Sequence, residues 1–289
     1  MAGGKRLHAW RKIAGLVLAV GLVALLGACS STTFVYNRLD GILPWYLDDY
    51  VELDSAQEEQ LDNLLADFLA WHRQQELPRY VALLDQISAD LDRPVSAVQV
   101  TATYAEMEQA GLRLQDASLD WLLTLGASLS EAQVGEFLAY LQEQQEEFEE
   151  KYLERSDREF REDSYQALED SLQDYLGRLS DEQRQRLRAA SLDLQRSDAA
   201  WLQERAVWLQ RLEQLLQRQP GWQQRLREAV ALRYEKVSEH YRAVFEHNLE
   251  VICAAVAGVL DSRSEKQDRR LRAELRDLRE DLQTLIAEA

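Results

Sequence analysis

Apolar residues recur at helical spacing along most of the chain. Positions three or four apart are apolar in a series of stretches, at about 54–76, 78–91, 96–125, 130–176, 181–218, 221–260 and 264–287. This spacing puts the apolar side chains on one face of a helix, and no segment shows the alternation of a half-buried strand. The pattern predicts an all-α fold, an elongated antiparallel bundle of about six to eight helices. We expect one bundle domain over residues 54–289, with a second lobe after about residue 180 as the alternative.

Three of the expected helices begin with the same local pattern. Segment 53–57 reads Leu-Asp-Ser-Ala-Gln, and similar segments stand at 129–133 and 179–183. The Asp or Ser is followed three positions later by Gln, which is a capping box: each side chain bonds the other residue's backbone N–H. The unequal intervals between the three copies indicate repeated helix starts and exclude a solenoid period. Gly126 is expected to cap a helix end, and Pro78 to start or kink a helix. The stretch 130–176 is expected to be interrupted near Ser156 and Asp157.

Two stretches have unusual apolar content. Between Leu141 and Phe160 apolar residues are few and Gln and Glu fill most other positions, which predicts a coiled-coil-like seam or a projecting arm. The run Val251–Leu260 is almost entirely apolar, so we expect it to be the most buried end of its helix. Cys253 lies in this run and is expected to be a small buried hydrophobic residue.

The N-terminal residues form a secretion signal. Basic residues are followed by an apolar run from Ile13 to Leu26, which is shorter than the roughly 20 residues of a membrane span. Leu26-Gly27-Ala28-Cys29 then matches a lipobox, in which the cysteine thiol accepts the lipid. We predict a lipoprotein signal peptide at 1–28 and lipid, palmitate included, on Cys29. An uncleaved anchor with a chance cysteine is the alternative. Ser30 replaces the Asp of an inner-membrane retention signal, which favours the periplasmic face of the outer membrane.

Residues 29–53 form the expected tether between the lipid and the bundle. This segment is rich in apolar and aromatic residues, which is not typical of a flexible linker, so we expect it to fold back onto the body.

Charge and motifs narrow the range of functions. The chain has 51 acidic and 33 basic residues, and this balance opposes binding to nucleic acid. There is no His-Glu-x-x-His run, no Gly-x-Ser-x-Gly elbow and no glycine-rich phosphate loop, so we expect no metal, no cofactor and no enzyme. The alternative is an enzyme with an unfamiliar site around His72, Arg73 and Glu76.

Two segments behind the lipobox resemble a family of proteobacterial lipoproteins of unknown function. They are 36–40 (Tyr-Asn-Arg-Leu-Asp), followed by Trp45, and 71–80 (Trp-His-Arg-Gln-Gln-Glu-Leu-Pro-Arg-Tyr). The resemblance implies a helical fold and brings no activity. We expect these residues to form either the joint that seats the tether on the bundle, which we favour, or a recognition surface: Tyr36, Asn37, Asp40, Trp45, Trp71, His72, Arg73 and Glu76.

Segments 129–133 and 179–183 are also similar to the Leu-Thr-x-x-Gln motif of the Spy/CpxP periplasmic chaperones, with Ser in place of Thr in a much longer chain. That likeness implies a helical cradle for unfolded clients. Our first expectation is a lipid-anchored envelope protein that acts by binding or scaffolding, with envelope proteins as partners. A client-holding chaperone or stress sensor is the alternative. Six tryptophans are expected to form the core or to line a groove: Trp45, Trp71, Trp121, Trp201, Trp208 and Trp222.

Overall fold

The computed structural model describes residues 31–288, and this part of the chain is helical without strands. The predicted signal peptide, the predicted lipobox and Cys29 lie outside the described residues. The elements are α2 (Ser31–Tyr36), α3 (Leu39–Leu47), α4 (Ser55–Trp71), the π-helical turn η1 (His72–Glu76), α5 (Leu77–Asp90), α6 (Ala97–Ser128), α7 (Glu131–Leu153), α8 (Asp157–Leu176), α9 (Asp181–Asp193), α10 (Asp198–Leu215), α11 (Trp222–Ala231), α12 (Glu239–Asp261) and α13 (Glu265–Ala287). The expected all-α fold is confirmed.

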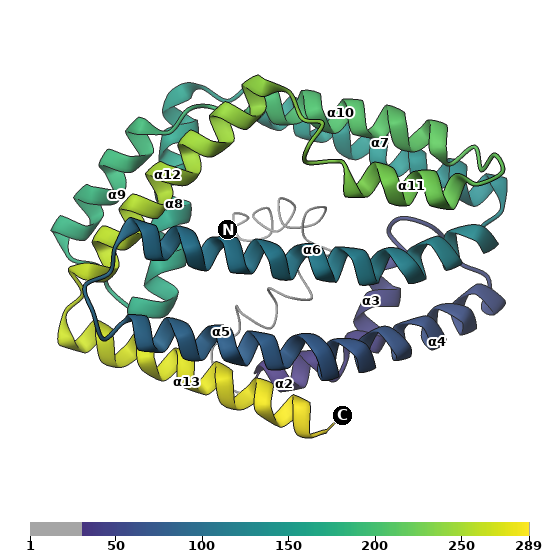
Figure 1. The fold of residues 1–289 in the computed structure, drawn as a ribbon. Helices are drawn as coiled ribbons and strands as arrows, with labels where there is room; N and C mark the ends of the chain where they lie inside the picture. The colour runs from purple at the N-terminus through teal and green to yellow at the C-terminus, as the bar shows by residue number, and fades with distance from the viewer. Residues whose placement is uncertain (1–30, 289) are drawn as a thin grey trace, which may run out of the picture.

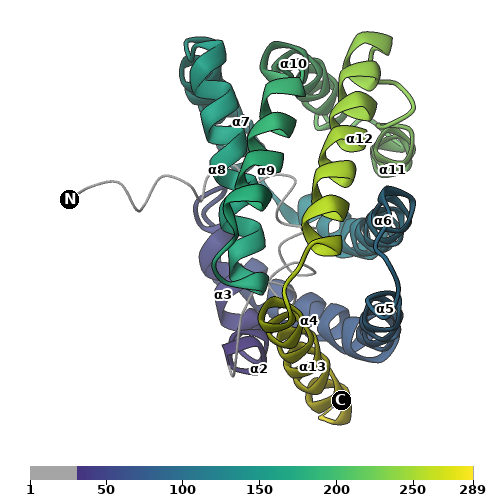
Figure 2. The same cartoon turned by 90° about the vertical axis from the view of Figure 1, so that its left-hand side faces the viewer.

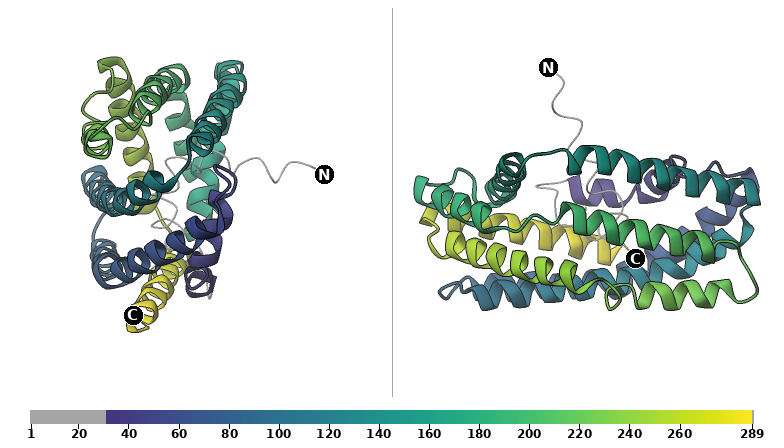
Figure 3. Two further views of the ribbon diagram at one scale, coloured as in Figure 1. Left: turned by 90° about the vertical axis from the view of Figure 1, so that its right-hand side faces the viewer. Right: turned by 90° about the horizontal axis from the view of Figure 1, so that it is seen from above.

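The helices form an elongated bundle in which α4, η1 and α5 follow one another in one line and α6 runs back beside α5 (Figure 1). Figure 1 shows α5 and α6 side by side along the long axis, with α13 packed on α5. Helix α12 lies against both α6 and α9, and α7 pairs with α10. In Figure 2, α2 and α3 lie on one side of the molecule, and α5, α6 and α11 on the other. Figure 3 shows the same elongated arrangement from above and from the end.

The bundle has more helices than expected because two predicted long helices are broken. The stretch 181–218 is divided into α9 and α10, and 221–260 into α11 and α12. The tether adds two short helices, α2 and α3. The predicted break near residue 156 is confirmed, since Ser156 caps α8. Gly126 does not cap a helix: α6 continues through it and ends at Ser128.

Capping boxes connect the helices as well as starting them. The three predicted boxes are present, and three further ones start α6 at Ser96, α8 at Ser156 and α13 at Ser264. Gln57 and Gln133 exchange two side-chain hydrogen bonds of 3.0 and 2.6 Å, joining the starts of α4 and α7. Gln183 and Gln267 do the same at 3.2 and 2.9 Å, joining α9 to α13. Each pair therefore connects two helix starts that are distant in the sequence.

The Gln- and Glu-rich part of α7 is a seam and not a projecting arm. Helix α7 packs along α10, and its buried positions are Leu141, Gln145, Phe148 and Tyr152. The corner after α7 is held by Asp198, which is 1 % exposed and bonds both Arg155 and Arg196.

The main core joins both ends of the described chain. It contains Tyr36 and Leu39 near the beginning, and Leu282 and Leu285 near the end. The tether thus packs onto the body as expected. Helix α12 is the one helix of the described residues that is long and apolar enough to cross a membrane by length and composition. Four of its five buried residues lie in the C-terminal half, among them Cys253 at 3 % exposure, and the helix packs against α6 and α9.

Candidate functional site

A π-helical turn at His72–Glu76 is the centre of the candidate site. The backbone N–H of Leu77 bonds the carbonyl of His72, five residues earlier, which widens the turn. Pro78 follows at the start of α5. Proline has no N–H and its ring crowds the carbonyl four residues before it, so a regular α-helix cannot pass this point unchanged. The additional residue in the turn lets two consecutive side chains, Glu76 and Leu77, both be buried.

Tyr36 of the tether contacts His72 of this turn. Tyr36 Oη and His72 Nδ1 lie 2.8 Å apart and share a hydrogen bond, and the two rings are stacked with centroids 5.6 Å apart. Both side chains are buried, at 3 % and 0 % exposure. Burial raises the pKa of Tyr36 to about 12. Burial, with the nearby Arg73 charge, lowers the pKa of His72 to about 4. At neutral pH the pair is therefore a phenol and a neutral imidazole.

Asn37 extends the contact to the C-terminal end of the chain. Arg73 Nη2 donates to Asn37 Oδ1 at 2.7 Å, and Asn37 Nδ2 donates to Glu288 Oε2 at 3.0 Å. The Arg73 guanidinium also lies over the Tyr36 ring, 5.1 Å from its centroid. This connection joins α2, η1 and the end of α13. We call Tyr36, Asn37, His72 and Arg73 the tether lock.

Glu76 lies in the same turn but bonds in another direction. Its carboxylate is 1 % exposed and accepts from Arg113 Nε at 2.9 and 3.0 Å, with Arg113 Nη2 at 2.9 Å. Arg79 Nη1 adds a bond of 3.1 Å. The hydrogen bond to Glu76 raises the pKa of Arg113. This ion cluster joins η1 to α6, which places it beside the tether lock and not within it.

The structure does not bring the other expected residues into the lock. Asp40 is exposed, and its Oδ1 accepts from the backbone N–H of Gly41. Trp45 is 70 % exposed, on α3. Trp71 is half-buried and packs on the rings of Phe68 and His72. Trp71 is thus a packing neighbour of the lock, whereas Asp40 and Trp45 lie on the surface.

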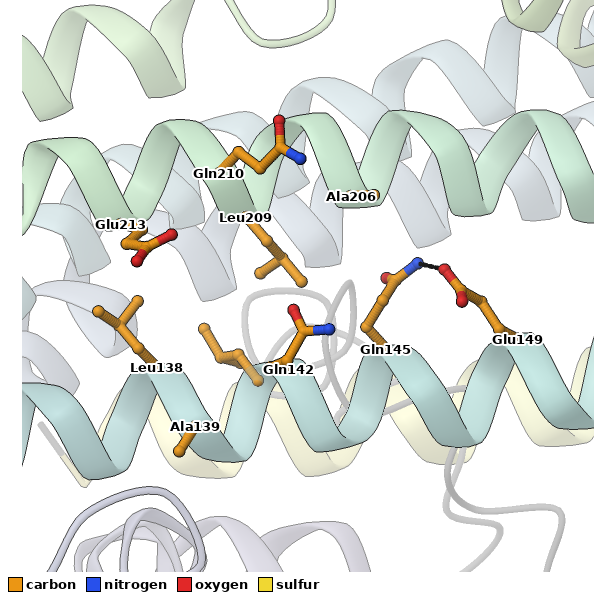
Figure 4. A pocket seen from close by; sticks show the side chains of 10 residues that line it. Leu138, Ala139, Gln142, Gln145, Glu149, Ala206, Leu209, Gln210 and Glu213 are labelled. Atoms are coloured by element: carbon orange, nitrogen blue, oxygen red, sulfur yellow. Dashed lines mark hydrogen bonds between the residues drawn. The ribbon is translucent and has the colours of Figure 1, made fainter.

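The tryptophans mostly belong to the core. Trp121 and Trp222 are buried, and three others are half-buried against apolar clusters: Trp71, Trp201 and Trp208. A groove of about 370 Å³ does lie between α7 and α10, but no tryptophan lines it. Figure 4 shows Leu138 of α7 opposite Glu213 of α10, and Leu209 of α10 pointing toward Gln142, with Gln145 bonded to Glu149 at 2.6 Å. His72 and Glu76 do not line it either.

Sequence reasoning missed the partners that lie far away in the chain. No sequence motif marked these partners, and only residue type and helix position could have suggested them: Arg113, Glu288 and the two glutamine pairs. Arg205 was also missed: it is 5 % exposed, and its Nη1 donates to Gln145 Oε1. Within residues 31–288 no group of three or more His, Cys, Asp or Glu side chains could hold a metal ion.

A family model matches residues 49–242, about two thirds of the chain, and its description is a family of unknown function, DUF6279. The match includes the 71–80 segment, which contains His72 and Arg73 of the tether lock. It begins after the 36–45 segment, which contains Tyr36 and Asn37. No curated protein and no solved structure matches the chain significantly. The chain thus belongs to the DUF6279 family of unknown function.

Proposed function

We propose that this protein is a lipid-anchored protein of the bacterial envelope that acts by binding or scaffolding, with its helical body held close to the membrane. The lipobox supports the lipid on Cys29, and Ser30 supports the periplasmic face of the outer membrane. Two or three acyl chains on one cysteine would hold the protein on the membrane stably.

The observation that carries this proposal is the tether lock, because it makes the tether a fixed part of the body. Cys29 precedes the first residue of α2 by two positions. By chain length alone, two residues and the turn and a half of α2 limit the distance from Cys29 to Tyr36 to about 15 Å. Because Tyr36 is bonded to His72, the body stays within this reach of the anchor. A protein held in this way keeps its body close to the membrane, as a scaffold of the envelope needs.

We assign the tether lock to this structural role and not to catalysis. His72 and Glu76 are buried at 0 % and 1 % exposure, and each contacts side chains of the body. The Leu-Ser-x-x-Gln segments have a structural explanation in the capping boxes and glutamine pairs, so they add no support for a chaperone.

The test has two parts, the anchor and the partner. Mass spectrometry of the membrane-extracted protein should find acyl chains on an N-terminal Cys29, and the Cys29→Ala protein should leave the membrane fraction. Crosslinking in whole envelopes, followed by identification of the captured proteins, should then give the same partners in repeated experiments. An unmodified Cys29 would contradict the anchor, and the absence of any reproducible partner would contradict the scaffold.

Two variants distinguish a joint from a recognition surface. His72→Ala and Asn37→Ala should both lower the melting temperature, and crosslinking of the folded variant to the partner should persist at low temperature. If Asn37→Ala keeps full stability but loses the partner, the cluster is a recognition surface and the proposed joint is wrong.

A further inference from the structure

The outer side of α2 and α3 carries a stripe of exposed apolar side chains. Phe34 is 59 % exposed, Ile42 39 % and Trp45 70 %. Ile42 and Trp45 are three residues apart in α3 and therefore share one face. The opposite face of α3 is buried in the main core through Leu39 and Leu43. The buried leucines already attach α3 to the core, so this attachment does not require the large apolar side chains on the outer side.

Arg38 connects the two halves of this stripe. Its guanidinium lies over the Phe34 ring, 3.6 Å from the centroid. Its carbonyl accepts from the backbone N–H of Ile42 at 2.9 Å as the first helical bond of α3, so Arg38 stands directly between α2 and α3. We call Phe34, Arg38, Ile42 and Trp45 the anchor-side stripe. It combines two aromatic rings, one aliphatic side chain and one cation.

We propose that the anchor-side stripe lies in the interfacial layer of the bilayer that holds the lipid of Cys29. This inference rests on the proposed lipid anchor. Phe34 is only five residues after Cys29, so chain length and one turn of α2 limit its distance from the anchor to about 12 Å. A side chain held so near the acyl chains reaches the headgroup region without any movement of the body.

The residue types match this location. Tryptophan is favoured at the membrane–water interface because its ring is apolar and its N–H remains hydrated. Trp45 is also distinct within the molecule, since the other tryptophans among residues 31–288 are buried or half-buried. The Arg38 guanidinium, held over the Phe34 ring, would offer a positive charge to lipid phosphates beside that ring.

The surrounding charge indicates which lipid surface fits. Three exposed acidic residues adjoin the stripe, Asp40, Asp48 and Asp49, and the whole chain is acidic. Repulsion would disfavour a strongly anionic surface. The stripe therefore fits a neutral phospholipid surface, with Arg38 as its single basic contact.

Tryptophan fluorescence tests this proposal on the lipidated full-length protein. We would reconstitute the membrane-extracted protein into neutral phospholipid vesicles whose acyl chains carry bromine, a quencher of nearby tryptophans. We expect bromolipid to quench part of the emission, and Trp45→Phe to lose that quenched part. Phenylalanine at this exposed position leaves folding and anchoring intact. Trp208→Phe, on α10, is the matched control, and it should keep the quenched part.

The outcomes separate this proposal from the lipid anchor. Vesicle flotation reports the anchor, and bromolipid quenching reports the stripe. If the protein floats with the vesicles but Trp45 is not quenched, the stripe does not enter the interface and this proposal is overturned. If the protein does not float and Cys29 carries no lipid, the proposed function fails and this inference fails with it.

A second copy of the chain is the other partner that could cover the anchor-side stripe. We would measure iodide quenching of Trp45 at rising protein density on unbrominated vesicles. Under our proposal iodide protection depends on lipid and not on protein density. Protection that grows with protein density, without bromolipid quenching, would assign the stripe to self-association and overturn the membrane contact.

Discussion

His72 has two ring nitrogens, and the structure gives a partner to one of them. Nδ1 shares a hydrogen bond with Tyr36, whereas Nε2 is buried without a partner among the described residues. Such an unsatisfied buried group is costly to the folded state. The bond to Tyr36 is therefore the polar contact that fixes the orientation of the ring. The buried site favours the neutral imidazole over the charged form.

Tyr36→Phe tests the value of this bond at the residue scale. The substitution keeps the ring stacked on His72 and removes the hydroxyl, leaving Nδ1 without its partner. We expect the free energy of unfolding to fall by about 1–3 kcal/mol, measured by denaturant titration at neutral pH. Tyr46→Phe is the matched control on α3, since its hydroxyl bonds the half-buried Tyr50. A loss no larger than in the control would contradict the importance of the lock.

The pH dependence follows from the lowered pKa of His72. In the unfolded chain His72 binds a proton near its ordinary pKa of 6.5, whereas the folded protein binds it only near pH 4. Between these values the unfolded state holds more protons, so stability falls as the pH falls from 6.5 towards 4. This difference in pKa corresponds to about 3 kcal/mol of the free energy of unfolding, which is present in full above pH 6.5 and is lost as the pH falls towards 4. The His72→Gln variant keeps every other titratable group and lacks this imidazole, so it is the control. Between pH 6.5 and 4 the free energy of unfolding of the wild type should fall more than that of the variant. Equal losses would contradict the buried neutral imidazole.

At the scale of elements, local sequence predicted where helices begin better than where they end. The capping boxes at Asp54, Ser130 and Ser180 were correct because a cap depends on residues within four positions. The breaks between α9 and α10, and between α11 and α12, were missed because neither contains proline or glycine. Leu194 leaves the helix in extended conformation, and Asn248 of α12 bonds the backbone of Gln195. That break is thus stabilised by a residue 53 positions away.

The glutamine pairs lead to a prediction at the same scale. Gln183 is 1 % exposed and bonds Gln267 as well as its own helix start, whereas Gln99 caps α6 with bonds only to Ser96. Gln99→Ala should cost about 1 kcal/mol as a lost cap. Gln183→Ala also leaves buried partners unsatisfied, so it should cost about 1–3 kcal/mol more. Thermal unfolding of both variants measures the difference, and equal losses would show that the pairing between helices adds no stability.

At the scale of the whole molecule, the sequence predicted the helical fold and the return of the tether onto the body. It also singled out Tyr36, Asn37, His72 and Arg73, which do meet in space. It did not predict that Asp40 and Trp45 would lie outside that contact. Their place depends on which face of α3 packs inward, and three buried leucines on one side of α3 determine this. The groove between α7 and α10 was not predicted, because it depends on the spacing of two helices far apart in the chain.

A body held close to its anchor requires that α2 and α3 are a fixed part of the body. Hydrogen exchange on the full-length protein, in its proposed lipidated and membrane-bound form, tests this most directly, because amide protection reports local opening free energies. We predict that amides of α2 and α3 are protected nearly as well as those of α4. We also predict that Tyr36→Phe speeds their exchange while leaving α11, which is distant from the lock, unchanged. Exchange of α2 and α3 at unprotected rates in the wild-type protein would show a flexible tether and would contradict the account.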